Sequence, residues 1–373
     1  MSEFRVPVTK ITDFLAIPNA DKIELAKVFD FNVVVRKGQY KVGDTVIYAP
    51  IDSILPNELE YKIFGPDSKV KLNKGRIRQI RLRGAVSQGM LIDPSDTSLK
   101  NLTEGDDVSE KLGIIKYEPE APSYQSNLPR VRKERNKFYE NPYFHQYGGL
   151  VNIKFYPEMF PEGSDVVYQE KLHGSNFRCG FLPQTPKGIW QKILKYFNKF
   201  PEQQFCFGSN TVQRQHSSKK NTSTYYGEDI YAQMVKKYNL ENILPANTIL
   251  YGEVYGPGIQ KNYDYGLTEL EIVVFDIKVL ADDKKSNQWL NVDQVKEFCK
   301  QRGLPIVPEL YRGPHSKELL QQHSKGASKI GTQPIREGVV IRDPKETTCY
   351  AGKKMFKLLN EDYLDLKDTS DWH

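Results

Sequence analysis

One stretch, residues 165–178 (DVVYQEKLHGSNFR), limits the fold of this chain more than any other. Its first five residues have an apolar centre and predict a buried strand, and Gly174 predicts a tight turn before a second extended segment begins at Asn176. Lys171 therefore stands at the end of a buried strand and beside a turn. Most lysines are surface charges, so a reactive amine at this place requires chemical partners from elsewhere in the chain.

The length and composition of the chain indicate an ordinary globular protein. Its 373 residues favour two domains, and its net charge of +6 is mild. No apolar stretch approaches the ~20 residues that span a bilayer, and the first residues lack the apolar core of a signal peptide. We expect a monomer with no membrane partner.

The four cysteines are widely spaced and form no metal-binding pattern, which favours reduced, mostly buried thiols. Such thiols are typical of an intracellular protein. We expect a cytoplasmic location by default, and nuclear or organellar locations stay open.

Residues 1–115 predict a small all-β domain. Strands are expected at 23–28, 31–36 and 44–49, and a glycine-containing turn region separates the last two. Short strands at this spacing suit a sandwich or a small barrel.

A basic stretch follows at residues 69–83, and it contains no acidic residue. Its basic members are Lys69, Lys71, Lys74, Arg76, Arg78, Arg81 and Arg83. Apolar residues from Ile77 to Leu82 alternate with the arginines, apart from one slip near Gln79. This pattern predicts a bulged strand with one apolar and one basic face. The basic face suits a nucleic-acid backbone, and a merely solvated surface is the alternative.

Residues 116–148 have a proline-rich start and a basic end, which predicts an interdomain linker, either solvated or touching RNA. Residues 149–373 predict a second domain of strands with helices between them. The expected strands are 166–170, 248–254, 270–279, 338–342 and 354–358, and the expected helices are 227–238 and 292–302. Asn291 and Gly303 suit the two caps of the last helix. The polar end, residues 365–373, is expected to be loose.

Residues 186–200 predict another helix, in which an apolar face lies opposite lysines. The apolar positions are Ile189, Trp190, Ile193, Leu194 and Phe197, and the lysines are Lys192, Lys195 and Lys199. A basic amphipathic helix of this kind suits a membrane surface or a partner helix. Packing on its own domain is the interpretation that we favour.

Four stretches after Lys171 contain residues that could serve a reactive amine. Glu253 stands between glycines in a predicted strand, and Phe275 precedes an acid in another. Glu337 precedes an apolar strand, and the last strand carries lysines up to Lys357. Taken singly, these are typical of strand-end acids, a core aromatic and a solvated charge. Their order along the chain is the informative feature.

In this order the stretches resemble the motifs of the covalent nucleotidyltransferase superfamily, which contains polynucleotide ligases and mRNA capping enzymes. Within it, K-x-H-G-x-N at 171–176, F-G-S-N at 207–210 and the run 252–262 are similar to ATP-dependent RNA ligases. Two positions depart from the pattern. At residue 173 a histidine stands where the family commonly has an aspartate. In the family's K-x-K motif Lys357 is present, and either Lys353 or Lys354 would be the second lysine.

Near the start of the chain, residues 21–24, 43–46 and 82–90 resemble OB-fold modules that bind RNA. Capping enzymes and most DNA ligases carry their OB fold after the catalytic domain, so this order favours an RNA ligase. The resemblance implies an α+β protein. An N-terminal all-β OB-fold barrel is followed by a nucleotidyltransferase domain of antiparallel sheets with flanking helices.

The resemblance also implies the chemistry. Lys171 would be the catalytic nucleophile that takes AMP from ATP and passes it to an RNA 5′-phosphate, before an RNA 3′-hydroxyl attacks. The implied nucleotide-binding residues are Glu170, Leu172, Asn176, Arg178, Glu253, Phe275, Glu337, Lys354 and Lys357. Glu253 and Glu337 would hold Mg²⁺ or Mn²⁺ through water. The implied RNA-binding residues are Arg76, Arg78, Arg81 and Arg83.

Two other functions stay open. One is a non-catalytic RNA-binding protein with a degenerate nucleotidyltransferase domain. The other is an enzyme of the same chemistry that uses GTP or seals a DNA nick.

Overall fold

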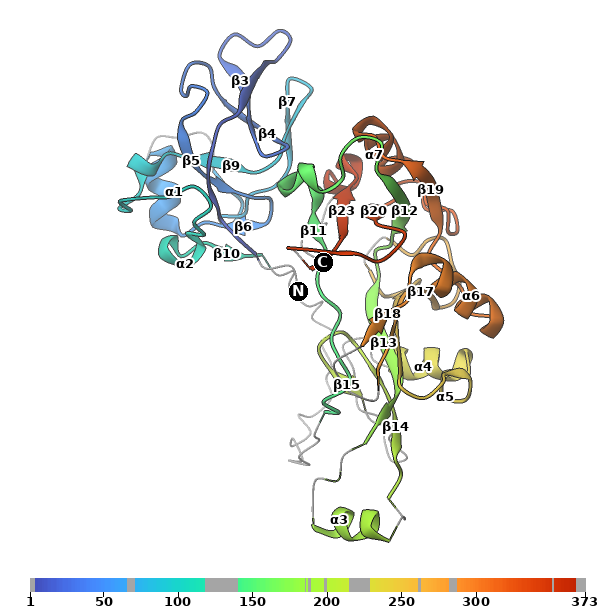
Figure 1. The fold of residues 1–373 in the computed structure, drawn as a ribbon. Helices are drawn as coiled ribbons and strands as arrows, with labels where there is room; N and C mark the ends of the chain where they lie inside the picture. The colour runs from blue at the N-terminus through green and yellow to red at the C-terminus, as the bar shows by residue number, and fades with distance from the viewer. Residues whose placement is uncertain are drawn as a thin grey trace, which may run out of the picture. The chain divides into compact units, whose positions relative to one another are not determined.

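The chain folds into two compact units in a computed structural model (Figure 1). Unit 1 contains Met1–Glu120, Gly149–Glu162 and Phe356–His373, and unit 2 contains Ala121–Gly148 and Gly163–Met355. The residues that the structure describes are 4–65, 71–117, 140–184, 186, 189–197, 200–214, 229–260, 263–281, 287–350 and 352–366.

Unit 1 is built mainly from two three-stranded antiparallel sheets. One contains β1 (Val8–Lys10), β5 (Thr45–Ala49) and β9 (Met90–Ile92), and the other contains β2 (Asp13–Ala16), β3 (Ile23–Val28) and β4 (Phe31–Arg36). The strands expected at 23–28 and 31–36 are confirmed, and the third begins one residue later than expected. Alternate residues of β4 are buried, as expected for a strand with one face on a core.

Short elements complete unit 1. They are β6 (Ser53–Ile54), α1 (Asn57–Phe64), β7 (Ile80–Leu82), β8 (Ala85–Ser87), the 3₁₀ turn Pro94–Asp96, α2 (Ser109–Leu112), β10 (Ile115–Lys116), β11 (Val151–Asn152), the 3₁₀ turns Ile153–Phe155 and Pro157–Met159, β23 (Met355–Leu359) and α8 (Glu361–Leu364). β11 pairs with β23 in parallel, so residues from three distant parts of the chain meet in this unit.

The basic stretch is not the continuous strand that the alternation predicts. Lys69 lies outside the described residues, and only Ile80–Leu82 forms a strand. A tight turn through Lys74 and Gly75, both with positive φ, breaks the extended path. Ile80 and Leu82 are exposed, whereas Gln79 is buried, so the expected apolar face is wrong.

Two arginines of this stretch, Arg78 and Arg81, contact the chain's own residues 361–366, which we call the C-terminal segment. Arg81 Nε lies 2.5 Å from Asp365 Oδ2, and its Nη2 lies 3.2 Å from Asp362 Oδ1. Gln79 Nε2 donates to Glu361 O and to Asp365 Oδ1, each at 2.7 Å. The expectation of a loose end therefore fails at Asp365, and residues 367–373 lie outside the described part.

Unit 2 contains a six-stranded antiparallel sheet in the order β15-β14-β13-β16-β17-β18. Its strands are β13 (Ser175–Pro183), β14 (Gln203–Gly208), β15 (Gln213–Arg214), β16 (Thr248–Tyr255), β17 (Glu271–Val279) and β18 (Gln288–Trp289). Within the same unit, β12 (Asp165–Lys171) lies between β20 (Gly338–Arg342) and β19 (Glu309–Pro314), antiparallel to both. A small hairpin joins β21 (Thr348–Cys349) and β22 (Gly352–Lys353). β12, β16, β17 and β20 confirm four expected strands of the second domain, and the fifth, expected at 354–358, forms as β23, of which Phe356–Leu359 belongs to unit 1.

Each face of the six-stranded sheet carries an apolar core. Helices α4 (Ile230–Lys237), α5 (Leu240–Ile243) and α6 (Val292–Arg302) pack on one face with Phe177 and Cys179. On the other face, residues 140–148 pack beside Tyr251, and Tyr147 N–H donates to Asn210 Oδ1 at 2.7 Å. Residues 118–139, the larger part of the expected linker, lie outside the described part. The domain division at 115 and 148 stays a prediction.

Two expected helices are present. α6 has the predicted bounds because Asn291 and Gln294 form a capping box and Gly303 closes the end in the left-handed conformation. α4 begins at Ile230 after the N-cap Asp229, and the first expected residues, 227 and 228, are not described. α7 (Lys317–Ser324) was not expected.

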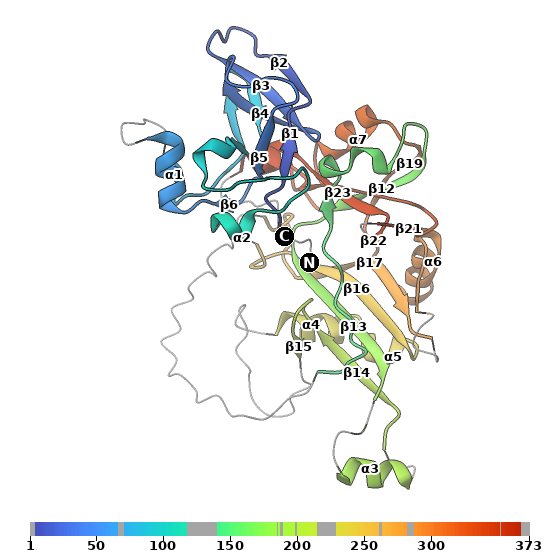
Figure 2. The same cartoon turned by 60° about the vertical axis from the view of Figure 1, so that its left-hand side comes forward.

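Helix α3 (Ile189–Tyr196) confirms a helix within the segment 186–200, but its expected packing on its own domain is wrong. Its apolar side chains are exposed because it lies in the connection between β13 and β14, beyond the end of the sheet (Figure 2).

Within the described residues, every helix is too short or too polar to cross a bilayer.

Candidate active site

The end of β12 places Lys171 against a buried carboxylate. Lys171 pairs with Gly338 across β20, so Glu337 lies one residue before that pair. Lys171 Nζ donates to Glu337 Oε1 at 2.6 Å; the lysine side chain is 11% exposed and that of Glu337 is fully buried. The amine is therefore shielded, and its position is fixed by an ion pair in a region of low dielectric.

Gly174 carries the chain from β12 into the six-stranded sheet. In that sheet Asn176 pairs with Glu253, so the glutamate lies directly beyond the turn. A Cβ on Gly174 would lie 2.3 Å from Val254 O and 2.8 Å from Glu253 Cγ. Glycine is required here because the turn passes against the strand that carries Glu253.

Gly174→Ala is expected to destabilise unit 2 by about 1–3 kcal/mol and to displace Glu253, because backbone atoms must move to admit the methyl group. Gly148→Ala is the matched control, since a Cβ there meets nothing within 4 Å. Urea unfolding of both variants measures the difference. Equal stability of the two variants would contradict the close approach at Gly174.

Glu253 interacts electrostatically with both Lys171 and Glu337. The pKa of Glu253 is raised to about 8, mainly because burial disfavours the charged carboxylate; the charge of Lys171 lowers the pKa and that of Glu337 raises it. Glu337 Oε2 is buried without a hydrogen-bond partner among the described residues. Glu337 thus offers one oxygen atom that still lacks a partner among the described residues.

These carboxylates fit a hydrated divalent cation. No group of three or more His, Cys, Asp or Glu side chains in the described part of the chain could hold a metal directly. Mg²⁺ keeps several waters and needs only one or two carboxylates beside substrate phosphates. The residues are therefore suited to a cation held partly through water.

The raised pKa of Glu253 gives a pH dependence with a defined sign. The folded state keeps a proton on Glu253 up to a pH of about 8, whereas the unfolded carboxyl loses it near its ordinary pKa of ~4.3. The folded state binds more protons in this window, so the free energy of unfolding is expected to fall as pH rises through it.

The measurement is thermal unfolding in a metal chelator at several pH values within that window. Glu253→Gln is expected to flatten the profile because the amide does not titrate. Glu297→Gln, an exposed position on α6, should keep the original slope. A Glu253→Gln profile as steep as that of the unmodified chain would show that another group causes it.

Phe275 lies at an irregularity in β17. Tyr251 pairs with Asp276 and Gly252 with Val274, so Phe275 is the extra residue of a bulge. A bulge re-aims a side chain relative to the regular pleat. The Phe275 ring is partly buried and lies edge-on to Tyr147, with ring centroids 4.9 Å apart.

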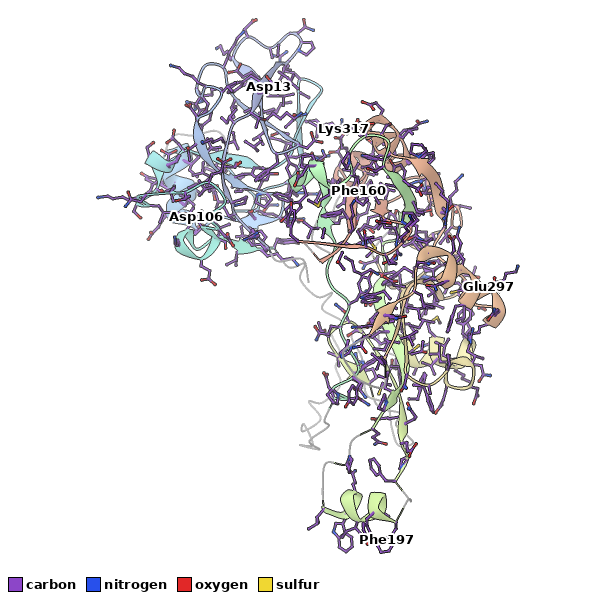
Figure 3. The ribbon with its side chains drawn as sticks, viewed as in Figure 1. Asp13, Asp106, Phe160, Phe197, Glu297 and Lys317 are labelled. Carbon is purple, nitrogen blue, oxygen red and sulfur yellow. The ribbon has the colours of Figure 1, made fainter. Side chains whose placement is uncertain are left out.

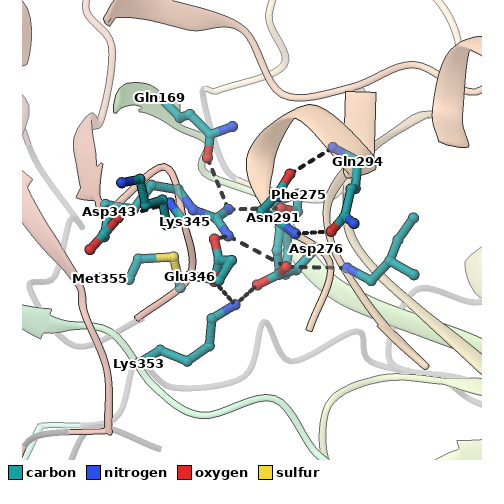
Figure 4. A network of polar contacts seen from close by, with 12 residues as sticks. Gln169, Phe275, Asp276, Asn291, Gln294, Asp343, Lys345, Glu346, Lys353 and Met355 are labelled. Carbon is teal, nitrogen blue, oxygen red and sulfur yellow. Dashed lines mark hydrogen bonds and ion pairs between the residues drawn. The ribbon is translucent and has the colours of Figure 1, made fainter. Parts of the chain in front are cut away.

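A buried ionic network holds the backbone at Phe275 (Figure 4). Arg342, 1% exposed, donates from Nη1 to Phe275 O and to Gln169 Oε1, each at 3.2 Å. Its Nη2 pairs with Glu346 and lies 3.5 Å from Asp276 Oδ1.

Lys353 joins the same two acids. Its Nζ lies 2.8 Å from Glu346 Oε2, and it also pairs with Asp276, which accepts a hydrogen bond from Tyr147 Oη at 2.7 Å. Sequence patterns did not single out this network. The signal that was present is a strand of buried residues ending in Arg342, because a buried arginine needs acidic partners.

The other implied nucleotide-binding residues near Lys171 have different surroundings. Glu170 is buried, accepts Lys329 N–H at 2.8 Å, and has its pKa raised by burial. Leu172 is buried, and Asn176 Oδ1 is buried without a partner in the described part. Arg178 donates from Nε to Ser209 O at 2.8 Å and from Nη1 to Phe144 O, so two of its donors already serve the backbone.

The implied lysines and arginines are spread over both units. Lys354 lies between β22 and β23, with its N–H donating to Thr347 O at 2.9 Å, and Lys357 is buried in β23. Arg76 pairs with Asp52 at 2.7 Å, Arg78 donates to Leu366 O at 3.1 Å, and Arg81 binds the C-terminal segment. Arg83 is exposed in a turn with φ of 52°.

An aromatic shell that the sequence did not reveal surrounds His173. Its backbone N–H donates to Tyr265 Oη at 2.7 Å, and its ring lies edge-on to Tyr263. Burial and the charge of Lys171 lower the pKa of His173 to about 3, so this side chain is neutral. The alternating tyrosines of residues 263–265 were the available signal.

The fold and the site together define a class. Unit 2 joins β12, with its lysine, to an antiparallel sheet that supplies a buried carboxylate, which is a nucleotidyltransferase-like arrangement. An OB-fold domain model matches residues 5–94. The expected fold class is thereby confirmed: an N-terminal OB-fold domain precedes a sheet-rich nucleotidyltransferase-like domain.

The family follows from the sequence of the second domain. The RNA ligase family model matches residues 164–359, which is more than half of the chain. The chain belongs to the RNA ligase family.

Solved structures of the Naegleria gruberi RNA ligase have the same fold. A mutant with ATP and Mn matches with a TM-score of 0.71 and 21% identity, over 96% of this chain and 98% of that one. A mutant with AMP and Mn gives 0.72 and 22%, over 97% and 98%. The ligase with PPi gives 0.71 and 22%, also over 97% and 98%. No curated protein sequence matches this chain.

Proposed function

We propose that this protein is an ATP-dependent RNA ligase that joins RNA 5′-phosphate and 3′-hydroxyl ends through a lysyl-AMP intermediate. The observation that carries the proposal is the position of Lys171, 11% exposed at the end of β12 with Nζ 2.6 Å from Glu337. The fold of the Naegleria gruberi ligase, solved with ATP, AMP and Mn, supports the choice of nucleotide and cation.

Lys171 must lose its ion pair before it can react. The free amine attacks the α-phosphorus of ATP, a nitrogen–phosphorus bond forms, and pyrophosphate leaves. Glu337 Oε1, 2.6 Å from Nζ, is placed to accept the proton that the ammonium must lose before the amine attacks. Phe275, re-aimed by its bulge, is positioned to stack on adenine.

Glu253 and Glu337 would hold Mg²⁺ or Mn²⁺ partly through water. When bound, the cation neutralises charge on the phosphate oxygens. Lys354 and Lys357 are the proposed partners of the α-phosphate, and Glu170, Leu172, Asn176 and Arg178 complete the proposed nucleotide site.

The N-terminal OB-fold domain is the proposed holder of RNA, through Arg76, Arg78, Arg81 and Arg83. Arg83 is the strongest of these candidates because it is exposed, whereas the other three contact groups of the chain itself. The proposed protein is monomeric and intracellular, and its domain limits lie at residues 115 and 148. The composition and the four free thiols support this part of the proposal.

Incubation with α-labelled ATP or GTP in Mg²⁺, followed by denaturing electrophoresis, tests the nucleotide. ATP is expected to label the protein. Nicked RNA, nicked DNA and single-stranded RNA with 5′-phosphates then define the acceptor, and sealing of RNA is expected. If neither ATP nor GTP labels the protein, the alternative of a non-catalytic RNA-binding protein is favoured. Label from GTP alone, or sealing of DNA alone, would favour the alternative of an enzyme that uses GTP or seals a DNA nick.

A further inference from the structure

Helix α3 lies at the tip of a hairpin. β13 ends at Pro183 and pairs there with Gln203 of β14, and Gln184 N–H donates to Glu202 O at 2.8 Å. The connection that carries α3 begins directly beyond this pair. Figure 3 shows Phe197 and the side chains near it projecting from the end of unit 2.

The apolar side chains of this connection are open to solvent to an unusual degree. Their exposed fractions are 73% for Ile189, 76% for Trp190, 40% for Ile193, 42% for Leu194, 84% for Tyr196 and 62% for Phe197. At the helical period these positions share an arc of about 160°, and positions 191, 192 and 195 share the opposite one. An exposed apolar face of this kind indicates an interaction site.

The charges of the same segment have one sign. Residues 186–200 contain Lys187, Lys192, Lys195 and Lys199 and no acidic residue. A segment that combines this basic charge with an apolar helix face is complementary to a surface that carries negative charge and has an apolar layer beneath it.

We propose that α3 is an interfacial anchor that binds this protein to the surface of an anionic lipid bilayer. Trp190 and Tyr196 suit the headgroup boundary, where aromatic side chains with a polar edge are enriched. Ile193, Leu194 and Phe197 supply the apolar contact below it, and the lysine positions supply attraction to anionic headgroups. This proposal of a peripheral contact departs from the expectation of no membrane partner, which stays a prediction.

A bilayer explains the face better than a macromolecular partner does. A second copy of the chain would need about 800 Å² per partner for a stable dimer, which eight helical residues do not supply. RNA phosphates would satisfy the lysines but would leave Ile193 and Leu194 in water.

The anchor lies apart from Lys171. β13 begins beside the Gly174 turn and its nine residues run to Pro183, a span of about 30 Å for an extended strand. Binding of α3 to a membrane would therefore leave the end of β12 accessible.

Vesicle sedimentation of the full chain tests the proposal. The chain is expected to sediment with phosphatidylcholine vesicles that contain about 30% phosphatidylserine, and to stay in solution with phosphatidylcholine alone. The double variant Trp190→Ser/Phe197→Ser is expected to lose this binding. The control Val42→Ser/Tyr61→Ser changes side chains that are 62% and 61% exposed on unit 1 and should bind as the unmodified chain does.

The charge is tested separately. Lys192→Gln and Lys195→Gln are each expected to weaken vesicle affinity about fivefold, and added salt should weaken the binding of the unmodified chain. A wild-type melting temperature for each variant shows that the fold is intact.

Three results would each overturn the proposal. The first is no sedimentation with anionic vesicles, and the second is equal binding to both kinds of vesicle. The third is equal binding by the Trp190→Ser/Phe197→Ser variant. Self-association of the unmodified chain in the absence of lipid, abolished by that variant, would instead assign α3 to an interface between copies.

Discussion

Lys171→Met is expected to abolish the covalent nucleotide adduct and to lower ligation of 5′-phosphorylated RNA by at least about 10³-fold. Methionine fills a similar volume but has no amine, so no bond to the α-phosphorus can form. The measurement is transfer of α-label from ATP to the protein. Lys300→Met, an exposed position on α6, should label normally.

RNA that is adenylylated in advance separates chemistry from folding in this variant. Sealing of such RNA needs attack by the 3′-hydroxyl but no lysine nucleophile. Lys171→Met is therefore expected to seal it at a rate within about tenfold of the unmodified chain. Normal labelling of Lys171→Met would place the nucleophile at another residue.

Arg342→Met is expected to destabilise unit 2 by about 3–5 kcal/mol, because it leaves buried carboxylates without their cation. Arg342 is 1% exposed and contacts Asp276, Glu346 and the carbonyl of Phe275. The melting temperature should fall by about 10 °C. Near-ultraviolet circular dichroism during urea unfolding measures the loss in free energy.

Two further variants test whether burial of the ionic network causes the expected loss of stability. Arg312→Met removes an ion pair with Asp293 and Glu309 that is partly exposed, and it should cost less than about 1 kcal/mol. Arg342→Lys keeps the charge but loses the planar fork of donors, so an intermediate loss is expected. Similar losses for Arg342→Met and Arg312→Met would mean that burial does not strengthen this network.

Part of the site could be predicted from local patterns in the sequence. A buried strand followed by a glycine turn predicts the place of Lys171, and the structure has it at the end of β12. Glu253 and Glu337 were singled out by the order of the motifs and by the family resemblance. Their contacts with Asn176 and Lys171 join segments that are far apart in the sequence, which no local pattern indicates.

The failures concern residues whose partners are distant in sequence. Alternation in the basic stretch suggested a strand with a free basic face, but Gly75 turns the chain and Arg81 meets Asp362 and Asp365. The hydrogen bonds from Arg178 to the carbonyls of Phe144 and Ser209 were likewise not expected, while its implied role at the nucleotide stays a prediction. No local pattern reports a partner that lies tens or hundreds of residues away.

The contacts of the C-terminal segment also determine when unit 1 can finish folding. Gln79 and Asp365 are separated by 286 positions, and the β11–β23 pair Val151–Phe356 by 205. During synthesis the N-terminal strands emerge first, yet the acids that pair with Arg81 emerge only after unit 2. Completion of this unit must therefore wait until the C-terminal segment has been synthesised. A nascent chain would carry a partly assembled OB-fold domain while the whole of unit 2 is being made.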